Sequence, residues 1–378
     1  MESPERIRLF VPTFSVDDCL DEIRECLEIG WTGAGYKTEE FESAWSEYSG
    51  LSNSLFLNSN SSGLLIAMMS LKQKYQWPDD AEILTTPLTF VSTNHAIVQA
   101  GLIPVFCDVD ETLCLSLNSL EKSLTKNTKA VMFVGLGGNV GQYLEIAKWC
   151  AEKELRLILD AAHMAGTKIN DQQVGKEADF VVFSYQAVKN LPTGDSGLIN
   201  TPDSELATIA RELSWLGINT STYQRNQDKA GYKWDYDVNE LGIKANGNAI
   251  MAAIALVQLR TLDRDNDYRK QCAGYYQSKL ENSGKWILVP HFQGSSRHLF
   301  QIRTTGISRE KVISDLNSKN IDVGVHYKLN THYSPFKPYR KDHPFASKVE
   351  REILSLPLHL RLDEVSLHTI TESLLSIA

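Results

Sequence analysis

The sequence predicts an α/β fold, with a large, mostly parallel mixed sheet flanked by helices and a smaller α+β domain at the C-terminal end. Short apolar runs of strand length alternate with helical patterns through the first half of the chain, which is typical of parallel sheets with helices on both faces. In addition, 378 residues exceed one average domain and fit two. We expect a large domain at residues 12–248 and a small one at 249–378, with which residues 1–30 could also pack.

Composition and charge narrow the class of protein. Apolar residues make up 42% of the chain, which is enough to form a sizeable core. The net charge is −9 and no basic block occurs, so a nucleic-acid partner is not expected. No apolar run approaches the roughly 18 residues of a membrane span. The N-terminal residues also lack the apolar stretch of a signal peptide, so we expect no membrane contact and a cytoplasmic location.

The cysteines are expected to be reduced thiols in the core. There are six, and none forms a CxxC pair, so neither a disulfide framework nor a metal site is predicted. Cys19 and Cys26 are spaced so that both lie on one face of a helix, which favours packing over chemistry.

The expected elements follow from apolar spacing and turn residues. Apolar residues recur at helical spacing and predict a helix at residues 16–29, after Ser15 as the expected N-cap. By the same criterion, further helices are expected at residues 37–48, 64–75, 92–100, 117–124, 144–153, 249–262, 268–282 and 309–319. Strands are expected at residues 55–57, 82–85, 103–107, 130–134, 155–159, 180–183, 300–303 and 322–327. Residues 211–239 are irregular and rich in aromatic side chains, which is typical of a functional or interface loop.

Polar residues follow three of the predicted strands at the point where each strand ends. These are the turn at residues 58–63, Asp160, and the segment from Ser184 to Lys189. The carboxyl ends of parallel strands share one edge of a sheet, and ligands bind there. The first turn also opens a helix, where backbone N–H groups favour a phosphate. An ordinary serine-rich N-cap would give the same residues, so both interpretations stay open.

Asp160 and Lys189 together fit the needs of pyridoxal 5'-phosphate (PLP). This cofactor takes a lysine for its aldehyde and an acid for its pyridine nitrogen. At about 4 Å and an effective dielectric constant of about 20, a carboxylate stabilises a protonated ring nitrogen by roughly 4 kcal/mol. Phe90 could stack on the ring, Ser184 could bind the phosphate, and His163 could touch the ring or its 3'-oxygen. The alternatives are a surface lysine, a turn carboxylate, a core phenylalanine and a structural histidine.

At these residues the chain resembles the DegT/StrS sugar aminotransferases, which are PLP enzymes of the type I, aspartate-aminotransferase fold. The resemblance runs from about residue 31 to residue 362, and the order and spacing of its pieces are specific. The matching pieces are Trp31-Thr32-Gly33, Phe41-Glu42, Thr89-Phe90-Val91-Ser92-Thr93, residues 104–110, Asp160-Ala161-Ala162-His163, Phe183-Ser184-Tyr185, Lys189-Asn190, Ala252-Ala253, Gln258-Leu259 and residues 354–358.

The resemblance implies transfer of an amino group from glutamate to a nucleotide-linked keto-deoxysugar. Lys189 would carry PLP as an internal aldimine and also move the proton. The residues implied to hold PLP are Asn60, Ser61, Phe90, Asp160, His163, Ser184 and Lys244. Those implied to lie near the substrate are Gly33, Gln186, His326 and Tyr327. The family also implies a homodimer in which the segment at residues 211–246 completes the neighbour's site.

The chain departs from the family pattern in places, and other functions remain to be weighed. The phosphate turn carries Asn60-Ser61 where the family has Gly-Thr, and Lys244 stands where an asparagine is usual. Relatives with histidine in place of Lys189 dehydrate sugars, so the lysine argues against dehydration. Alternative functions are amino transfer to another keto-polyol, such as a keto-inositol, and a PLP-binding regulator without turnover. Nicotinamide binding through residues 135–141 is disfavoured because the glycine spacing is wrong.

Overall fold

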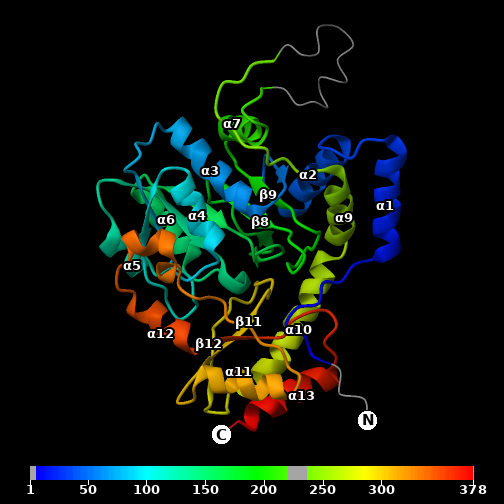
Figure 1. Ribbon diagram of the computed structural model, residues 1–378, viewed down its shortest axis with the longest axis vertical. Coiled ribbons are helices and arrows are strands. Elements are labelled where there is room, and N and C mark those ends of the chain that lie inside the picture. The colour runs from blue at the N-terminus through cyan, green and yellow to red at the C-terminus, as the bar shows by residue number, and fades with distance from the viewer. Residues whose placement is uncertain (1–5, 220–235, 378) are drawn as a thin grey trace.

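A seven-stranded sheet forms the centre of the larger part of the molecule (Figure 1). The computed structural model describes residues 6–219 and 236–377. Across the sheet, the strands are β1 (Leu55–Leu57), β9 (Gly197–Asn200), β8 (Phe180–Ser184), β5 (Arg156–Asp160), β4 (Thr128–Val134), β2 (Glu82–Thr85) and β3 (Ile103–Phe106). Every pair is parallel except the two that involve β9. The predicted mixed, mostly parallel sheet is confirmed.

Helices cover both faces of this sheet because its strands are apolar on both sides. Neighbouring residues of β4 illustrate this: Phe133 packs with Tyr143 in one hydrophobic cluster, and Met132 packs with Leu64 in another. The helices of this part are α1 (Val16–Ile29), α2 (Tyr36–Ser49), α3 (Asn60–Lys74), α4 (Val91–Gln99), α5 (Leu117–Ser123), α6 (Tyr143–Glu152), α7 (Ser204–Ser214) and α9 (Ala249–Leu259).

A small antiparallel sheet forms the centre of the C-terminal part. Its strands are β10 (Trp286–Leu288), β11 (Phe300–Thr304) and β12 (Ile353–Leu356). A separate hydrophobic cluster, which includes Tyr276, Ile302 and Leu316, joins it to its helices. These helices are α10 (Leu262–Leu280), α11 (Arg309–Ser318) and α13 (Glu364–Leu375), whereas α12 (Pro344–Glu352) packs in another cluster through Ala346 and Val349. In Figure 1, α9 lies beside α1, and α10 leads from there to the small sheet. The division of domains at residue 248 stays a prediction.

The strand expected at residues 322–327 is wrong. The third strand of the small sheet is β12, whose residues are all buried and pair with β11 from Phe300 to Arg303. Residues 322–327 are only partly buried, and Gly324 makes an isolated bridge to Ser355. The alternating valines Val323 and Val325 therefore led to a wrong strand prediction. Most of β12 was recognised from the sequence only as a family motif, at residues 354–358.

The two elements that directly follow the lysine turn, β9 and α7, were not predicted. Strand β9 has only two strongly apolar residues, Leu198 and Ile199, and it is too short to stand out from its turn. Helix α7 follows Asp203, whose carboxylate accepts hydrogen bonds from the N–H groups of Glu205 and Leu206. That capping residue is a signal available in the sequence. Part of the predicted irregular loop, residues 220–235, lies outside the described residues.

The helix predicted at residues 16–29 is confirmed, and its cysteines lie on its buried face. Cys19 and Cys26 are buried, whereas Val16 and Leu27 are more than half exposed. Ser15 occupies the N-cap position, but its side chain makes no capping hydrogen bond. All six cysteines are free and buried, as expected. No helix within the described residues is long and apolar enough to cross a membrane.

A buried lysine joins α1 to α2 and gives a test of stability. Lys37 is 2% exposed, and its Nζ lies 2.9–3.0 Å from the carboxylates of Glu22, Glu25 and Glu40. We expect Lys37→Met to lower the free energy of unfolding by about 2 kcal/mol, because three carboxylates lose their shared cation. Urea unfolding measures the change. The control is Lys72→Met, whose partner carboxylate is largely exposed and whose loss should cost less than about 1 kcal/mol. An equal loss in both variants would contradict the role of Lys37.

Candidate active site

The carboxyl ends of four parallel strands bring the predicted site residues to one edge of the large sheet. Strand β1 leads to the turn before Asn60, β2 leads to the loop before Phe90, β5 ends at Asp160, and β8 ends at Ser184. Lys189 lies in the turn that follows β8. This edge is where ligands bind in open α/β sheets, as the sequence predicted.

Asp160 is a buried carboxylate held by three donors. Its Oδ2 accepts a hydrogen bond from the Thr93 hydroxyl at 2.7 Å, and its Oδ1 accepts one from the Asn60 amide and one from the Ala162 N–H, each at 3.2 Å. Burial raises the pKa of Asp160 above its ordinary value, while these donors and the positive charge of Lys189 act in the opposite direction. A cation placed beside this carboxylate would therefore be strongly favoured.

The turn after β1 starts α3 and presents its N-terminus to the same edge. The Ser59 hydroxyl accepts a hydrogen bond from the Ser62 N–H, so Ser59 is the N-cap. The buried Asn60 turns its side chain inward, where Nδ2 donates to Asp160 and to the carbonyl of Val182 at 3.0 Å. Ser61 is exposed in the first helical turn. The turn thus offers N–H groups for an anion, while the Asn60 side chain holds the acid.

Gly197, the first residue of β9, is in close contact with this turn. A Cβ at this position would lie 2.5 Å from the backbone nitrogen of Asn60 and 2.8 Å from the carbonyl oxygen of Phe183. Backbone atoms cannot yield as a flexible side chain can, so we expect Gly197→Ala to displace the turn, at a cost of about 1–3 kcal/mol. The affinity of this variant for the expected cofactor, PLP, can be measured by absorbance titration and should fall. The control is Gly274→Ala in α10, where a Cβ meets nothing within 4 Å. Unchanged affinity in Gly197→Ala would disprove the contact's importance.

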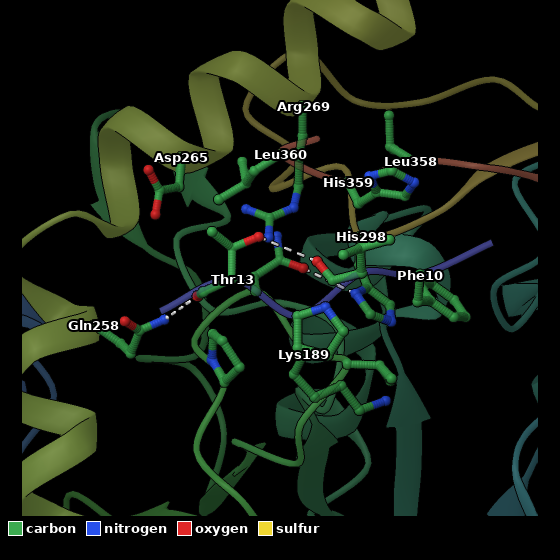
Figure 2. Close-up of a pocket in the computed structure, with 15 residues that line it drawn as sticks. Phe10, Thr13, Lys189, Gln258, Asp265, Arg269, His298, Leu358, His359 and Leu360 are labelled. Atoms are coloured by element: carbon green, nitrogen blue, oxygen red, sulfur yellow. Dashed lines mark hydrogen bonds between the residues drawn. The ribbon is translucent and has the colours of Figure 1, made fainter. Parts of the chain in front are cut away.

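Lys189 lies half-buried in a turn, beside a small cavity that is shown in Figure 2. The cavity has a volume of about 10 Å³, which is room for roughly one water molecule. Arg269 reaches into it from α10, and His298 also lines it. Burial lowers the pKa of Lys189 to about 8, and the negative charge of Asp160 opposes this shift. A lysine with such a pKa is partly a free amine near neutral pH, as a nucleophile or a base must be.

Aromatic and imidazole rings stand next to Lys189. The Nε2 of His163 lies 3.4 Å from the Tyr327 hydroxyl, and the two rings are 6.4 Å apart and nearly parallel. Burial and the positive charge of Lys189 hold the pKa of His163 well below its ordinary value. Phe90 is 58% exposed and its ring lies 6.0 Å from that of Tyr327. A large apolar ring left open at this sheet edge is suited to stacking on a flat ligand.

The other predicted residues near Lys189 shape its surroundings. Ser184 is buried at the end of β8, and its hydroxyl lies 3.5 Å from the N–H of Gln186. Gln186 in turn accepts a hydrogen bond from the Val188 N–H at 3.1 Å, within the turn. His326 bonds through Nδ1 to the Ser355 hydroxyl at 2.9 Å, and burial together with the charge of Lys189 lowers its pKa to about 4.

Two predicted residues, Gly33 and Lys244, lie in a different place. Both line a second cavity of about 800 Å³ between α2 and α7, whose described lining includes neither Lys189 nor Asp160. Lys244 Nζ lies 4.6 Å from the centre of the Trp215 ring. Within one chain, these residues are therefore not brought together with the lysine. The segment from residue 211 to residue 246 borders the same cavity, and its central part lies outside the described residues.

Two contributions to the site were missed from the sequence. Thr93 lies in a stretch noted for Phe90, but its hydroxyl donates to Asp160 across 67 residues. The loop around the 3-10 helix η1 (Leu136–Gly138), rejected above as a dinucleotide site, has a different role. Its Gly137 has a positive φ of 68°, and its N–H donates to Nδ1 of His163 at 3.1 Å. No grouping of three potential metal ligands occurs among the described residues.

Comparison with known proteins gives consistent results over nearly the whole chain. The model of the DegT/DnrJ/EryC1/StrS aminotransferase family matches residues 15–375. The spore coat polysaccharide biosynthesis protein SpsC of Bacillus subtilis is 32% identical, over 95% of this chain and 94% of that protein. The dTDP-4-dehydro-2,3,6-trideoxy-D-glucose 4-aminotransferase of Saccharopolyspora spinosa is 31% identical, over 97% and 95% of the two chains.

Two solved structures that superpose on the chain are titled as an aminotransferase and a putative sugar aminotransferase. PseC of Helicobacter pylori, an aminotransferase of pseudoaminic acid biosynthesis, superposes with a TM-score of 0.91 at 25% identity, over 98% of both chains. Spr1654 of Streptococcus pneumoniae superposes with a TM-score of 0.86 at 26% identity, over 97% of both chains, in its PLP form, and it is also known in a PMP form. From its sequence and its fold, the chain belongs to the DegT/DnrJ/EryC1/StrS aminotransferase family.

Proposed function

We propose that this protein is a PLP-dependent aminotransferase that moves an amino group from glutamate to a nucleotide-linked keto-deoxysugar. The observation that carries the proposal is the presence of a lysine with a lowered pKa, Lys189, and a buried carboxylate, Asp160, at one sheet edge, where each acts on the charge of the other. The relatives support the reaction class, since they include sugar aminotransferases.

The residues at this edge fit PLP. The cofactor has an aldehyde, a ring nitrogen, a flat ring and a phosphate, and the edge offers a group for each. Lys189 would bind the aldehyde, Asp160 would pair with the ring nitrogen, and Phe90 and His163 would pack against the ring. The N–H groups at the start of α3 would bind the phosphate. When bound, PLP supplies an electron sink that makes a proton on an adjacent carbon acidic.

The chain's own residues would control proton movement and charge. Lys189 Nζ, as a free amine, can accept a proton from the donor and return it to the acceptor. The Thr93 hydroxyl and the Asn60 amide keep the Asp160 carboxylate in one orientation. His163 stays neutral, because burial and the charge of Lys189 lower its pKa, so it can accept the Gly137 N–H without adding a positive charge.

The proposed acceptor rests on the names of relatives, whereas the glutamate donor and the homodimer rest on the family resemblance described above. The Saccharopolyspora spinosa protein is named for a dTDP-linked keto-sugar, and PseC for a role in the biosynthesis of pseudoaminic acid. We propose a nucleotide-linked keto-sugar here and a homodimer in which residues near Lys244 serve the neighbour's site. The second cavity, which Lys244 and Gly33 line, is where such a partner would bind. Location in the cytoplasm stays a prediction.

Spectroscopy and substrate profiling test the proposal. The purified protein with PLP should show a visible absorbance band, and borohydride reduction should fix the pyridoxyl group on Lys189, as peptide mass spectrometry can show. In a separate sample that has not been reduced, glutamate alone should convert the cofactor to its amine form, and a panel of nucleotide-linked keto-sugars should restore it. Turnover of a keto-inositol instead would move the assignment to the other substrate class. PLP binding without any turnover would indicate a regulator.

A further inference from the structure

The segment from Ser296 to His298 contacts three of the loops that contribute to the site. Its backbone and side chains bond to the loop of Gly137, the turn of His163 and the turn of Lys189. The His298 N–H donates to the Gly137 carbonyl at 3.0 Å. The Ser296 hydroxyl donates to the carbonyl of His163 at 2.8 Å. This segment precedes β11 of the small sheet, so it ties that sheet to the edge of the large one.

On one side, the segment holds the residue next to Lys189. The buried Asn190 donates through Nδ2 to Asn266 at 2.7 Å and to the carbonyl of Ser296 at 2.9 Å. With both amide donors directed at oxygen atoms, its Oδ1 faces the Nδ1 of His298 at 2.8 Å. Nδ1 of His298 must therefore carry the proton and donate it. The bond fixes the Asn190 amide and, through it, the backbone that carries Lys189.

On the other side, the same histidine packs against His163. The two ring centres lie 4.3 Å apart with an angle of 33° between the planes. His163 is also held by the Gly137 N–H and by Tyr327. The His298 ring thus connects two groups that the proposed reaction needs in fixed positions, since it bonds to the neighbour of Lys189 and covers one side of His163.

We propose that His298, acting through Asn190, is a positioning residue that holds Lys189 and His163 in fixed positions relative to each other. The inference rests on the proposed function, because it assigns a role within that site, and it adds residues that the motif resemblance did not mark as functional. His298 is buried. A buried ring with one hydrogen bond to a neighbouring amide is well suited to transmit position, since its place is fixed by packing and by one directional contact.

The pKa of Lys189 should show whether its turn is held in place. The charge of Lys189 acts on one carboxylate, that of Asp160, and on the rings of His163, His298 and His326. A second carboxylate, that of Asp265, and the ring of His359 line the small cavity beside the lysine. Arg269, which lines the same small cavity, is the other cation there. Burial is the main reason for the lowered pKa of Lys189. A looser turn would admit water and let the pKa rise towards its ordinary value.

The test compares two replacements of His298 in the full chain. Asparagine can place an amide nitrogen where Nδ1 of the imidazole stands, so His298→Asn keeps a donor to Asn190, whereas His298→Leu removes it. In protein stripped of PLP, the rate at which Lys189 reacts with an amine-selective reagent is followed against pH by mass spectrometry. We expect a midpoint near pH 8 in the wild type and in His298→Asn, and a midpoint about one unit higher or more in His298→Leu.

Steady-state kinetics of the holoenzyme give a second measurement. In His298→Leu we expect kcat for amino transfer to fall about tenfold with KM changed much less, and in His298→Asn we expect most of kcat to return. The control His343→Leu removes another buried histidine, next to Phe106, and should leave both the midpoint and kcat unchanged. Equal midpoints and rates in all variants would overturn the proposal, as would an asparagine variant no better than leucine.

The outcomes for His298 and for the proposed function can be told apart. If wild-type protein does not transaminate any keto-sugar, the proposed function fails, but the labelling midpoints still decide whether His298 positions Lys189. If the wild type transaminates and His298→Leu retains its midpoint and its kcat, only the role of His298 is lost. Melting temperatures measured on the same samples show whether a change in midpoint comes with loss of the fold.

Discussion

Replacing Lys189 by alanine is expected to lower the rate of amino transfer by at least about a thousandfold, the upper part of the range that a positioned acid–base group contributes. The lysine has two tasks in the proposed reaction, because it binds the cofactor aldehyde and moves a proton through Nζ. Its pKa of about 8 means that burial has prepared it for both. The measurement is the glutamate half-reaction followed by absorbance, together with the loss of borohydride fixation.

The matched control is a lysine without a role in the site. Lys148 lies on α6 with an 81% exposed side chain and a long contact to Glu152. Lys148→Ala should leave the rate within a factor of about two, since an exposed pair contributes little. A small primary amine added to Lys189→Ala should restore part of the activity, because it can supply the missing free amine. A fully active Lys189→Ala would contradict the proposed function.

Asp160→Asn is expected to produce the second largest loss. The replacement keeps the shape of the side chain and removes its charge, which is the property that a protonated ring nitrogen needs. At an effective dielectric constant of about 20, the lost attraction is about 4 kcal/mol, which corresponds to roughly a thousandfold in rate if it acts fully in the transition state. Stopped-flow measurement of the half-reaction gives the rate directly.

Asp160→Asn should not destabilise the protein without cofactor, although the same replacement lowers the rate of amino transfer. Burial raises the pKa of Asp160, so the carboxylate is costly until a cation is beside it. Asp160→Asn should therefore leave the melting temperature of that form unchanged or higher. The control is Asp179→Asn, at the opposite end of the neighbouring strand, where the carboxylate accepts the Leu157 N–H at 2.8 Å. It should lose about 1 kcal/mol of stability and keep its rate. A drop in activity that merely follows a drop in stability would argue against the assignment.

The sequence could place those residues that follow directly from strand direction. Asp160 and Ser184 end neighbouring parallel strands, so their meeting at one edge was predictable from the alternation of strands and helices. Lys189 follows five residues after Ser184 and could not lie far away. The resemblance to a family then supplied a cofactor for them, and the match over residues 15–375 agrees with it.

Other contacts could not be predicted, because they depend on how distant segments pack. The Asn60 side chain bonds to Asp160 across 100 residues, and the Asn190 amide meets His298 across 108 residues. No local pattern shows which way such an amide points. Gly33 and Lys244 were placed with the lysine by resemblance alone, and in a single chain they line another cavity. Side-chain direction and subunit contacts were thus beyond the sequence, whereas strand ends were not.

The antiparallel strand β9 has a consequence for the entropy of the lysine's turn. A parallel continuation would carry the chain away from the edge after residue 196, but β9 returns at once, and its Gly197 pairs with Ser184. Residues 185–196 are therefore a loop closed at its base by two hydrogen-bonded strands. The entropy lost in closing it is incurred once, when the sheet forms. Ligand binding then costs less conformational entropy around Lys189, so a larger part of the favourable contact energy contributes to affinity.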